Sequence, residues 1–337
     1  MREVNVVRAR YLAHIADKLD AKGIPVERYL AGIHVPRDLL QQPDAIVSAL
    51  SLLQFMELAV RDTGWDLLGY EAGSVPIADH GPVGSYIMGA PTLYQAARRL
   101  ITGYKRETSI TDDYIAFEGG MAWICITPTL GSREQKQQVE LYNLNILQQL
   151  VRSALGSGWV PERVKICATE EKVLTEVPGM ARLDVEFGAD TTAIALPIDR
   201  LAAPLRKRSG SREWKGDEQY QDGMLTLDTM NALRRLVETY LPYNPTLEMV
   251  SRLTGISRRS LQRFLEAHGT SFSRLVEQVM LNRAIQLLGD TRLPLKEVAR
   301  ELGYSELAHF SRAFRRMTGL APSAYREKTL PFQGGGD

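Results

Sequence analysis

The sequence predicts two domains, a mixed α/β domain over residues 1–205 and an all-α domain over residues 228–328. Three observations predict this division. The chain has 337 residues, more than the roughly 100–200 residues that one domain usually takes. Strand-like patterns occur only before residue 200. The stretch Arg206–Gly223 is polar and has few aliphatic residues, so we place a linker at 206–227 and expect a tail at 329–337.

Charge is divided unevenly between the two predicted domains. The whole chain has a net charge of +1, with 44% hydrophobic and 24% charged residues, which is ordinary for a globular protein. Residues 228–337 hold 16 Lys and Arg against 11 Asp and Glu, a net +5, whereas the preceding 227 residues have a net charge of −4. A basic end and a mildly acidic end suggest two separate tasks.

Several classes of protein are excluded by residue usage. Two cysteines, Cys125 and Cys167, are too few for a disulfide scaffold or a cysteine-rich metal site. The first ten residues lack the apolar segment of a secretory signal, and no apolar stretch reaches the ~20 residues of a membrane span. We therefore expect a cytoplasmic protein with reduced thiols, no metal, no cofactor and no membrane contact.

Helices are predicted over most of residues 1–100. The segment 8–19 places apolar side chains at helical spacing, and 50–58 continues a similar pattern. A stretch rich in Gly and Pro, 73–84, precedes a further helix at 92–100, for which Thr92 is the expected N-cap. We expect residues 1–70 to be helical, with turns at the prolines.

From Thr108 the pattern changes to the alternation of strands. Two runs, 109–111 and 114–118, lie on either side of an Asp-Asp pair, and Gly119-Gly120 then separates the second run from 121–127. A two-residue Gly-Gly loop between such runs predicts a hairpin. Further strands are expected at 164–168, 183–187 and 192–196. A long helix predicted between them, at 132–155, is apolar on more than one face and is therefore either a core helix or a subunit contact.

The basic part of the chain contains an internal repeat. LEMVSRLTGIS (247–257) aligns with LKEVARELGYS (295–305) at a shift of 48 residues, and the similarity continues beyond. Each copy predicts a short helix, a turn through Gly255 or Gly303, and a second helix that Ser257 or Ser305 can cap. A helix at 273–288 is expected to link the two copies.

The second helix of each copy has an apolar inner face and a basic or polar outer face. Two helices joined by a short glycine turn, the second bearing Arg and Gln, form the helix-turn-helix unit that enters the major groove of DNA. The expected DNA contacts are Arg258, Arg259, Ser260, Gln262 and Arg263 in the first copy and Glu306, Leu307, His309, Arg312, Arg315 and Arg316 in the second.

Residues 228–328 resemble the double helix-turn-helix domain of the AraC/XylS family of bacterial transcription regulators. The resemblance is densest in ARELGYSELAHFSRAFRRMTGLAPSAYRE (299–327), and SRRSLQRFLEAHGTSF (257–272) is similar to the first-unit pattern, with Phe272 where proline is frequent. Residues 1–205 resemble more loosely the α/β effector-binding and dimerisation domain of a subgroup that includes ornithine-utilisation regulators, not the cupin barrel of the arabinose regulator. The segments that carry this second resemblance are GPVGSYIMGAPTLYQAARRL (81–100) and VEFGADTTAIALPIDRLAAPL (185–205).

The resemblance implies a sequence-specific DNA-binding regulator of transcription that acts as an activator. It implies promoter DNA and RNA polymerase as partners, homodimerisation, and a small-molecule effector in the first domain. The aromatic and basic side chains that we select for an effector pocket are Tyr86, Arg98, Tyr104 and Trp123, with Arg99 and Lys105 beside them. Core packing is the alternative for each aromatic. An amino-acid-like and a fatty-acid-like ligand are equally compatible.

Two other classes of function are alternatives to a DNA-binding regulator. An enzyme is disfavoured because the sequence has no zinc-protease, nucleophile-elbow or phosphate-loop motif. An acid–base pair of His80 with Asp79 is conceivable, and a hydrogen-bonded loop histidine is the alternative. An interaction module for an acidic protein would not explain two glycine-turn units in tandem. Within those units, Arg263 and Arg312 have a structural alternative, an ion pair with a residue such as Glu297 or Glu301.

Overall fold

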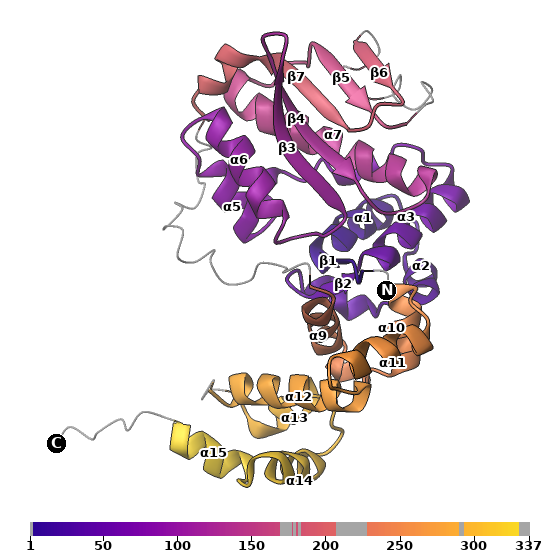
Figure 1. Cartoon of the computed structure of the whole chain (residues 1–337), viewed down its shortest axis with the longest axis vertical. Coiled ribbons are helices and arrows are strands. Elements are labelled where there is room, and N and C mark those ends of the chain that lie inside the picture. Colours follow the sequence, from indigo (N-terminus) through magenta and orange to yellow (C-terminus); the bar gives the residue numbers. More distant parts are fainter. Residues whose placement is uncertain are drawn as a thin grey trace, which may run out of the picture. The chain divides into compact units, whose positions relative to one another are not determined.

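The computed structural model describes residues 3–168, 177, 180, 183–206, 228–289 and 293–329 (Figure 1). Contacts divide the chain into two compact units, Asn5–Leu227 and Asp228–Asp337, the latter with Met1–Val4. Nearly all of the expected linker and of the expected tail lies outside the described residues, with Arg206 and Thr329 as the exceptions.

The first unit begins with helices around a small antiparallel ladder. The helices are α1 (Ala9–Ala21), α2 (Glu27–Gly32), α3 (Ala49–Thr63) and α4 (Leu68–Ala72). Strands β1 (Val6–Arg8) and β2 (Ile46–Ser48) pair with each other. The expectation that residues 1–70 form helices is wrong at these two strands. Three residues are too few for an alternating pattern to show in a sequence, and pairing with a distant segment creates both strands.

Two further helices, α5 (Pro82–Met88) and α6 (Leu93–Tyr104), precede the main sheet. Thr92 caps α6 as predicted, since its hydroxyl accepts a hydrogen bond from the backbone nitrogen of Gln95 at 3.3 Å. The cap satisfies one of the free amides at the start of the helix. The short 3₁₀ turn η2 (Ile77–Asp79) lies in the stretch rich in Gly and Pro.

The main sheet has the strand order β3-β4-β7-β5-β6. Its strands are β3 (Thr111–Glu118), β4 (Met121–Pro128), β5 (Arg163–Ile166), β6 (Asp184–Phe187) and β7 (Ala193–Pro197). Neighbours are antiparallel except β5 and β6, which are parallel. The predicted hairpin is confirmed: Glu118 pairs with Met121, and both loop glycines have a positive φ, +58° and +78°. The Asp-Asp pair lies inside β3 and does not separate two strands.

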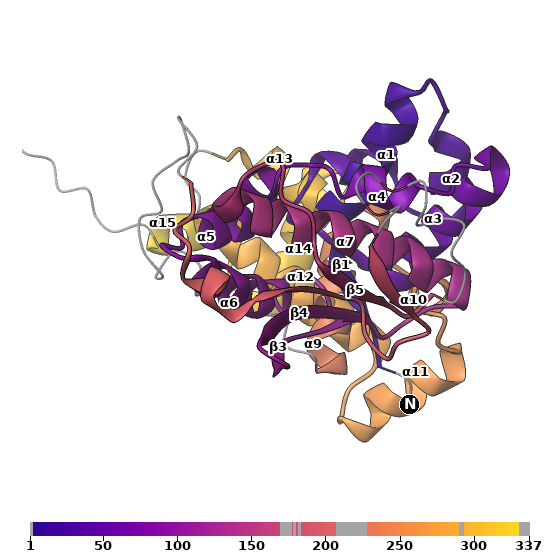
Figure 2. The same ribbon diagram turned by 90° about the horizontal axis from the view of Figure 1, so that it is seen from above.

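Helix α7 (Arg133–Leu155) is a core helix of the first unit. It contacts β4 and β7 of the sheet on one side and α3, α4 and α6 on others, and Figure 2 shows it between the sheet and helices α1, α3 and α4. Its apolar side chains from Val139 to Val151 are all buried within the unit. The interpretation of this helix as a subunit contact is therefore wrong, because its own unit covers the faces that a partner would need.

Close packing of α4 against α7 explains why residue 69 is a glycine. A Cβ atom on Gly69 would lie 2.1 Å from the carbonyl oxygen of Gln138, so only glycine allows this approach. The backbone nitrogen of Gly69 donates to the side-chain oxygen of Gln138 at 2.8 Å, and Asn145 donates to the carbonyl of Tyr70 at 3.0 Å. The polar side chains of the buried helix are thus used to hold α4.

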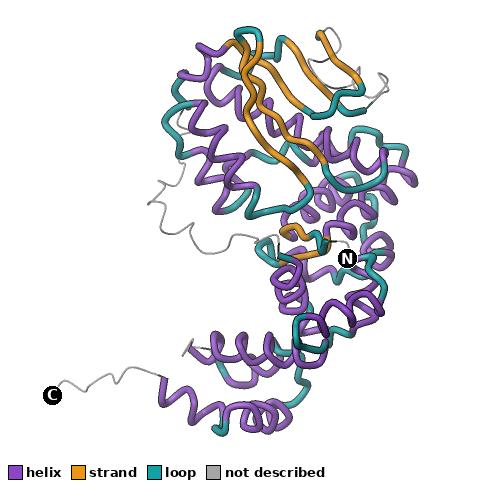
Figure 3. The backbone as a smooth tube through the Cα atoms, viewed as in Figure 1, coloured by secondary structure: helices purple, strands orange, loops and turns teal. Residues whose placement is uncertain are grey.

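The described residues of the second unit form helices joined by turns, with no strand among them, as predicted (Figure 3). Its helices are α9 (Thr229–Thr239), α10 (Leu247–Thr254), α11 (Arg258–Ala267), α12 (Phe272–Gly289), α13 (Leu295–Glu301), α14 (Leu307–Thr318) and α15 (Pro322–Thr329). Helix α12 contacts α9, α13 and α15, and its Leu275, Val279, Ala284 and Leu288 are buried. Within the described parts of both units, we find no helix with the length and apolar character needed to cross a membrane.

Candidate nucleic-acid interface and a cavity in the first unit

The first helix-turn-helix unit has the predicted turn geometry. Helix α10 ends at Gly255, whose φ of +67° is the left-handed conformation that glycine adopts without strain. Two residues later the hydroxyl of Ser257 accepts from the backbone nitrogen of Ser260 at 3.2 Å and caps α11. Val250 and Leu253 of α10 are buried, and α10 contacts α11. The capping prediction for Ser257 is confirmed.

The second helix-turn-helix unit, α13 and α14, differs from the first at its turn. Helix α13 is followed by Gly303, which has a φ of +81° and a position for Cβ only 2.5 Å from the carbonyl oxygen of Leu241. The expected cap by Ser305 is wrong: Glu306 occupies the N-cap position of α14 and makes no side-chain capping bond. Three residues separate Gly303 from α14, whereas two separate Gly255 from α11, so Ser305 lies one position before the cap. Phe310 and Phe314 of α14 are fully buried.

The outer face of α11 is exposed and mostly basic. Arg258, Arg259, Gln262 and Arg263 are all exposed, whereas Ser260 is half-buried, with its hydroxyl 2.9 Å from that of Ser257. Arg258 forms an ion pair with Glu248 of α10 at 3.0 Å. Within the described part of the chain, Arg259 and Arg263 form no ion pair and are available to a ligand.

The outer face of α14 is exposed along its whole length. Its expected DNA contacts Glu306, Leu307, His309, Arg312, Arg315 and Arg316 all reach solvent. Leu307 is 38% exposed, an apolar side chain in the first turn, and the imidazole Nε2 of His309 lies 3.9 Å from the carboxylate of Glu306. Arg316 is paired with Glu277 of α12 at 3.6 Å.

Arg312 and Arg315 form no ion pair among the residues that the structure describes. The structural alternative for Arg263 and Arg312 is not supported by the two glutamates considered, because Arg300 pairs with Glu297 at 2.8 Å and with Glu301 at 3.5 Å. The two outer faces therefore present unpaired guanidinium groups. Arg and Gln make bidentate contacts with guanine and adenine, and Arg also binds backbone phosphates.

The four effector-pocket residues selected from the sequence lie in three separate places. Tyr86 and Arg98 line a surface hollow between α5 and α6, with Arg99, whose guanidinium lies 4.9 Å from the centre of the Tyr86 ring. Trp123 packs on the sheet beside Cys125, and Lys165 lies 4.5 Å from its ring centre. Only Tyr104 lines an internal cavity.

That cavity lies between α7, the first helices and the start of β3. Its volume is about 50 Å³. Its lining residues are Val7, Tyr11, Ile15, Leu52, Met56, Tyr104, Thr108, Ile110, Thr111, Val139, Tyr142 and Asn143. The wall is thus mainly aliphatic and aromatic, with no charged side chain in the lining. Pockets for small organic ligands have this composition.

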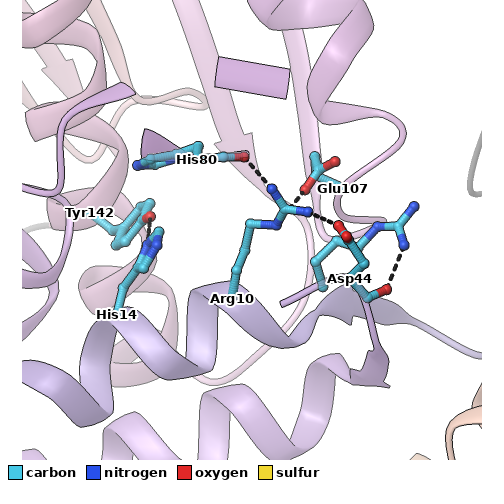
Figure 4. A network of polar contacts seen from close by, with 7 residues as sticks. Arg10, His14, Asp44, His80, Glu107 and Tyr142 are labelled. Carbon is cyan, nitrogen blue, oxygen red and sulfur yellow. Dashed lines mark hydrogen bonds and ion pairs between the residues drawn. The ribbon is translucent and has the colours of Figure 1, made fainter. Parts of the chain in front are cut away.

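Arg10, which precedes the cavity-lining Tyr11, is the centre of an ionic cluster (Figure 4). Arg10 of α1 is only 4% exposed; its guanidinium bonds to the carboxylate of Asp44 and to the carbonyl of His80, and its Nε lies 3.4 Å from the carboxylate of Glu107. Burial raises the pKa of Glu107, and the positive charge of Arg10 opposes this shift. Arg10, Asp44 and Glu107 are far apart in the chain, so the sequence does not predict that they come together.

Two buried histidines adjoin the same cluster. The Nδ1 atom of His14 lies 3.0 Å from the hydroxyl of Tyr142, and the Nε2 atom of His80 lies 3.2 Å from the carbonyl of Val75. Burial lowers the pKa of His14 to about 3 and that of His80 to about 4, so both rings are neutral at pH 7. The interpretation of His80 as a hydrogen-bonded histidine is confirmed.

Comparison with known families assigns both halves of the chain. The model described as the arabinose-binding domain of AraC transcription regulators, N-terminal, matches residues 23–205, which is more than half of the chain. The chain belongs to the AraC family of transcriptional regulators. A model of the helix-turn-helix domain matches residues 250–328 of this AraC-family protein. The family predicted from the sequence is thereby confirmed, and an enzymatic function is excluded because the family consists of regulators.

Individual relatives of this AraC-family regulator cover nearly its whole length. It is 25% identical over 336 residues to the ornithine utilization regulator of Pseudomonas aeruginosa, with 96% of each chain covered. It is also 25% identical over 342 residues, again with 96% of each chain covered, to an uncharacterized HTH-type transcriptional regulator of Mycobacterium tuberculosis. The crystal structure of the transcriptional regulator CdpR from Pseudomonas aeruginosa aligns with 91% of this chain and 98% of its own, at 20% identity and a TM-score of 0.40.

Proposed function

We propose that this AraC-family regulator activates transcription from promoters to which α11 and α14 bind. In this proposal residues 1–205 bind an effector and dimerise, and residues 228–328 bind DNA. Residues 206–227 link these two domains, and residues 329–337 form a tail. The observation that carries it is the set of unpaired, exposed guanidinium groups on α11 and α14, in the described part of two tandem helix-turn-helix units. These groups are Arg259, Arg263, Arg312 and Arg315.

The two helices divide the work of recognition in this proposal. On α11, Arg259 and Gln262 lie near the N-terminal end that meets base edges, and both side chains can make bidentate base contacts. On α14, Arg315 and Arg316 lie in the last turn, where phosphate contacts are favoured. The remaining predicted contacts complete the interface, and they are Arg258, Ser260 and Arg263 on α11 and Glu306, Leu307, His309 and Arg312 at α14.

Control by a small molecule is the second part of the proposal. It is supported by the effector-binding family of the first domain and by the mainly apolar cavity in that unit. An effector changes the affinity for DNA only by its differential affinity for two arrangements of the protein, and DNA changes the affinity for the effector by the same factor.

Homodimerisation, contact with RNA polymerase and residence in the cytoplasm complete the proposal, and membership in the AraC family supports each of them. The apolar helix α7 lends no support to a dimer, because its own unit covers it. Sedimentation of the full chain at tens of micromolar tests homodimerisation. A chain that sediments as a monomer would contradict it. A promoter-reporter assay tests activation, and loss of expression on adding the regulator would indicate a repressor instead.

Binding of the full chain to duplexes selected from a random pool tests the DNA-binding part. We expect a strong salt dependence, with a slope of about −0.9 in log K against log salt for each phosphate neutralised. We also expect protection of two major-groove segments about 34 Å apart. Affinity that does not change with salt, or a footprint limited to half a helical turn, would overturn the proposal.

A further inference from the structure

The first turn of α14 is apolar where the first turn of α11 is basic. Helix α14 begins with Leu307 and Ala308, and both residues are exposed. Helix α11 begins instead with Arg258 and Arg259, which are exposed as well. The arginines of α14 start only at Arg312, in its second turn. The two helices of the proposed DNA interface therefore present different chemistry at their N-terminal ends.

Leu307 lies outside the apolar core of its own unit. It is 38% exposed, and Ile285 of α12, at 37%, is the other large apolar side chain that is exposed in the described part of this unit. The buried aromatic residues of α14 begin one turn later, with Phe310. Covering the Leu307 side chain with an apolar group of a partner would remove apolar surface from water, which is favourable.

The other groups at this end of α14 do not attract phosphates. Glu306, at the N-cap position, has an exposed carboxylate that makes no capping bond. The Nε2 atom of His309 lies 3.9 Å from that carboxylate. Residues 305–311 contain no Lys or Arg. Since a carboxylate is repelled by the DNA backbone, base edges are the part of DNA that this turn is suited to meet, as the N-terminal residues of recognition helices do.

An alkyl side chain at a base edge has one suitable partner. Thymine is the only base that presents a methyl group in the major groove, and the other groups on base edges are hydrogen-bond donors or acceptors. Leu307 can cover a thymine methyl group, whereas covering a donor or an acceptor would remove its water without replacing the hydrogen bond. Ala308 adds a second, shorter apolar surface beside it.

We propose that Leu307 selects a thymine in the half of the DNA site that α14 occupies, by packing on the methyl group at C5. This inference rests on the proposed function, because it requires α14 to lie in the major groove. It assigns a base to a helix whose first turn has none of the bidentate donors of α11. Such a contact neutralises no phosphate, so it adds specificity without adding salt dependence.

Replacement of single thymines by deoxyuridine tests the contact, because the two nucleotides differ only in the methyl group. The full chain is titrated by fluorescence anisotropy with its selected duplex, and each thymine of the protected segments is replaced in turn. We expect at least one replacement to weaken binding about fourfold, the effect of one buried methyl group.

Variants connect this loss to Leu307. Leu307→Ser should bind the thymine and deoxyuridine duplexes equally at that position, whereas Leu307→Met, which keeps an apolar side chain, should retain a difference of about twofold or more. Both variants should fold, because position 307 is exposed. Ile285→Ser is the matched control, since it removes an equally exposed apolar side chain from α12, and it should keep the full difference. The loss of affinity in Leu307→Ser should be the same factor at about 50 and 200 mM salt.

Three results would overturn the inference. They are binding that no thymine replacement weakens, a Leu307→Ser variant that keeps the difference at every thymine, and a loss of affinity in Leu307→Ser that shrinks with salt as a phosphate contact does. The proposed function is tested separately, by salt-dependent binding of the wild-type chain to the selected duplexes. Specific binding by the wild-type chain after any of these three results would remove only the thymine contact. The absence of specific binding would remove the proposed function and this inference with it.

Discussion

Arg315→Ala should weaken DNA binding equally for all sequences and reduce its salt dependence. Arg315 is exposed in the last turn of α14 and forms no ion pair within the described part of the chain, so its charge is fully available to a phosphate. One phosphate contact contributes about −0.9 to the slope of log K against log salt, so its contribution shrinks about 3.5-fold between 50 and 200 mM salt. We therefore expect the defect of the variant to be about 3.5 times larger at the lower salt concentration.

Arg316→Ala should have a smaller effect than Arg315→Ala. The Arg316 guanidinium lies 3.6 Å from the carboxylate of Glu277, and DNA must compete with this contact. The competition is weak, because both side chains are largely exposed and such surface pairs contribute about 0–1 kcal/mol. Arg315→Ala should therefore weaken DNA binding more than Arg316→Ala, because only Arg316 is already paired with a carboxylate among the described residues.

Fluorescence anisotropy of the full chain on one duplex, at salt concentrations from 50 to 200 mM, measures these slopes. Arg300→Ala is the matched control, since it removes an exposed arginine from α13 that is already paired with Glu297 and Glu301. We expect the control to keep the wild-type slope within error. The reasoning fails if Arg315→Ala leaves the slope unchanged, or if binding-site selection shows that this variant prefers different bases.

Three further predictions concern base recognition and stability. Arg259→Ala and Gln262→Ala should each relax base preference at one position, by about 1–3 kcal/mol, in binding-site selection. Unchanged base preference in both variants would contradict the assignment of base contacts to α11. Burial raises the pKa of Asp113 to about 7, above its unfolded value, so it contributes stability at low pH that is lost as the pH rises toward 7. Asp113→Asn should therefore raise the free energy of unfolding, measured with urea, more at pH 8 than at pH 5, and an equal effect at both would contradict this. Gly303→Ala should lower the melting temperature more than the matched Gly319→Ala. Both glycines have a positive φ, but only at position 303 would a Cβ come within 4 Å of a neighbour, a backbone carbonyl. Equal decreases in melting temperature would mean that the structure relaxes around the added Cβ.

The features predicted from the sequence depend on short-range signals. The hairpin followed from Gly119-Gly120, because a left-handed two-residue loop between strands is a local requirement. The helix-turn-helix units followed from a repeat whose glycine and serine positions determine the turn. The prediction is wrong at Ser305, because one additional residue between Gly303 and α14 moves the cap to Glu306. A local signal identifies an element but not its last residue.

Features that depend on distant contacts could not be predicted. Nothing in the sequence near Arg10 indicates that it pairs with Asp44 and Glu107, since only the folded unit brings the three together. The residues of the cavity come from the first helices, the end of α6, the start of β3 and α7, so Tyr104 was selected for its type while Tyr11 and Asn143 were missed. The apolar pattern of α7 predicted burial but did not show whether this chain or a second copy provides the cover.

The central position of α7 determines how the first unit opens. Because the sheet and helices α3, α4 and α6 all contact it, every side chain of α7 between Val139 and Val151 except the half-buried Gln149 is buried while those elements remain in place. Backbone amides in such a segment exchange with deuterium only when the whole unit unfolds. The amides of this segment should be the slowest to exchange in the first unit, and their exchange rate should report its global stability.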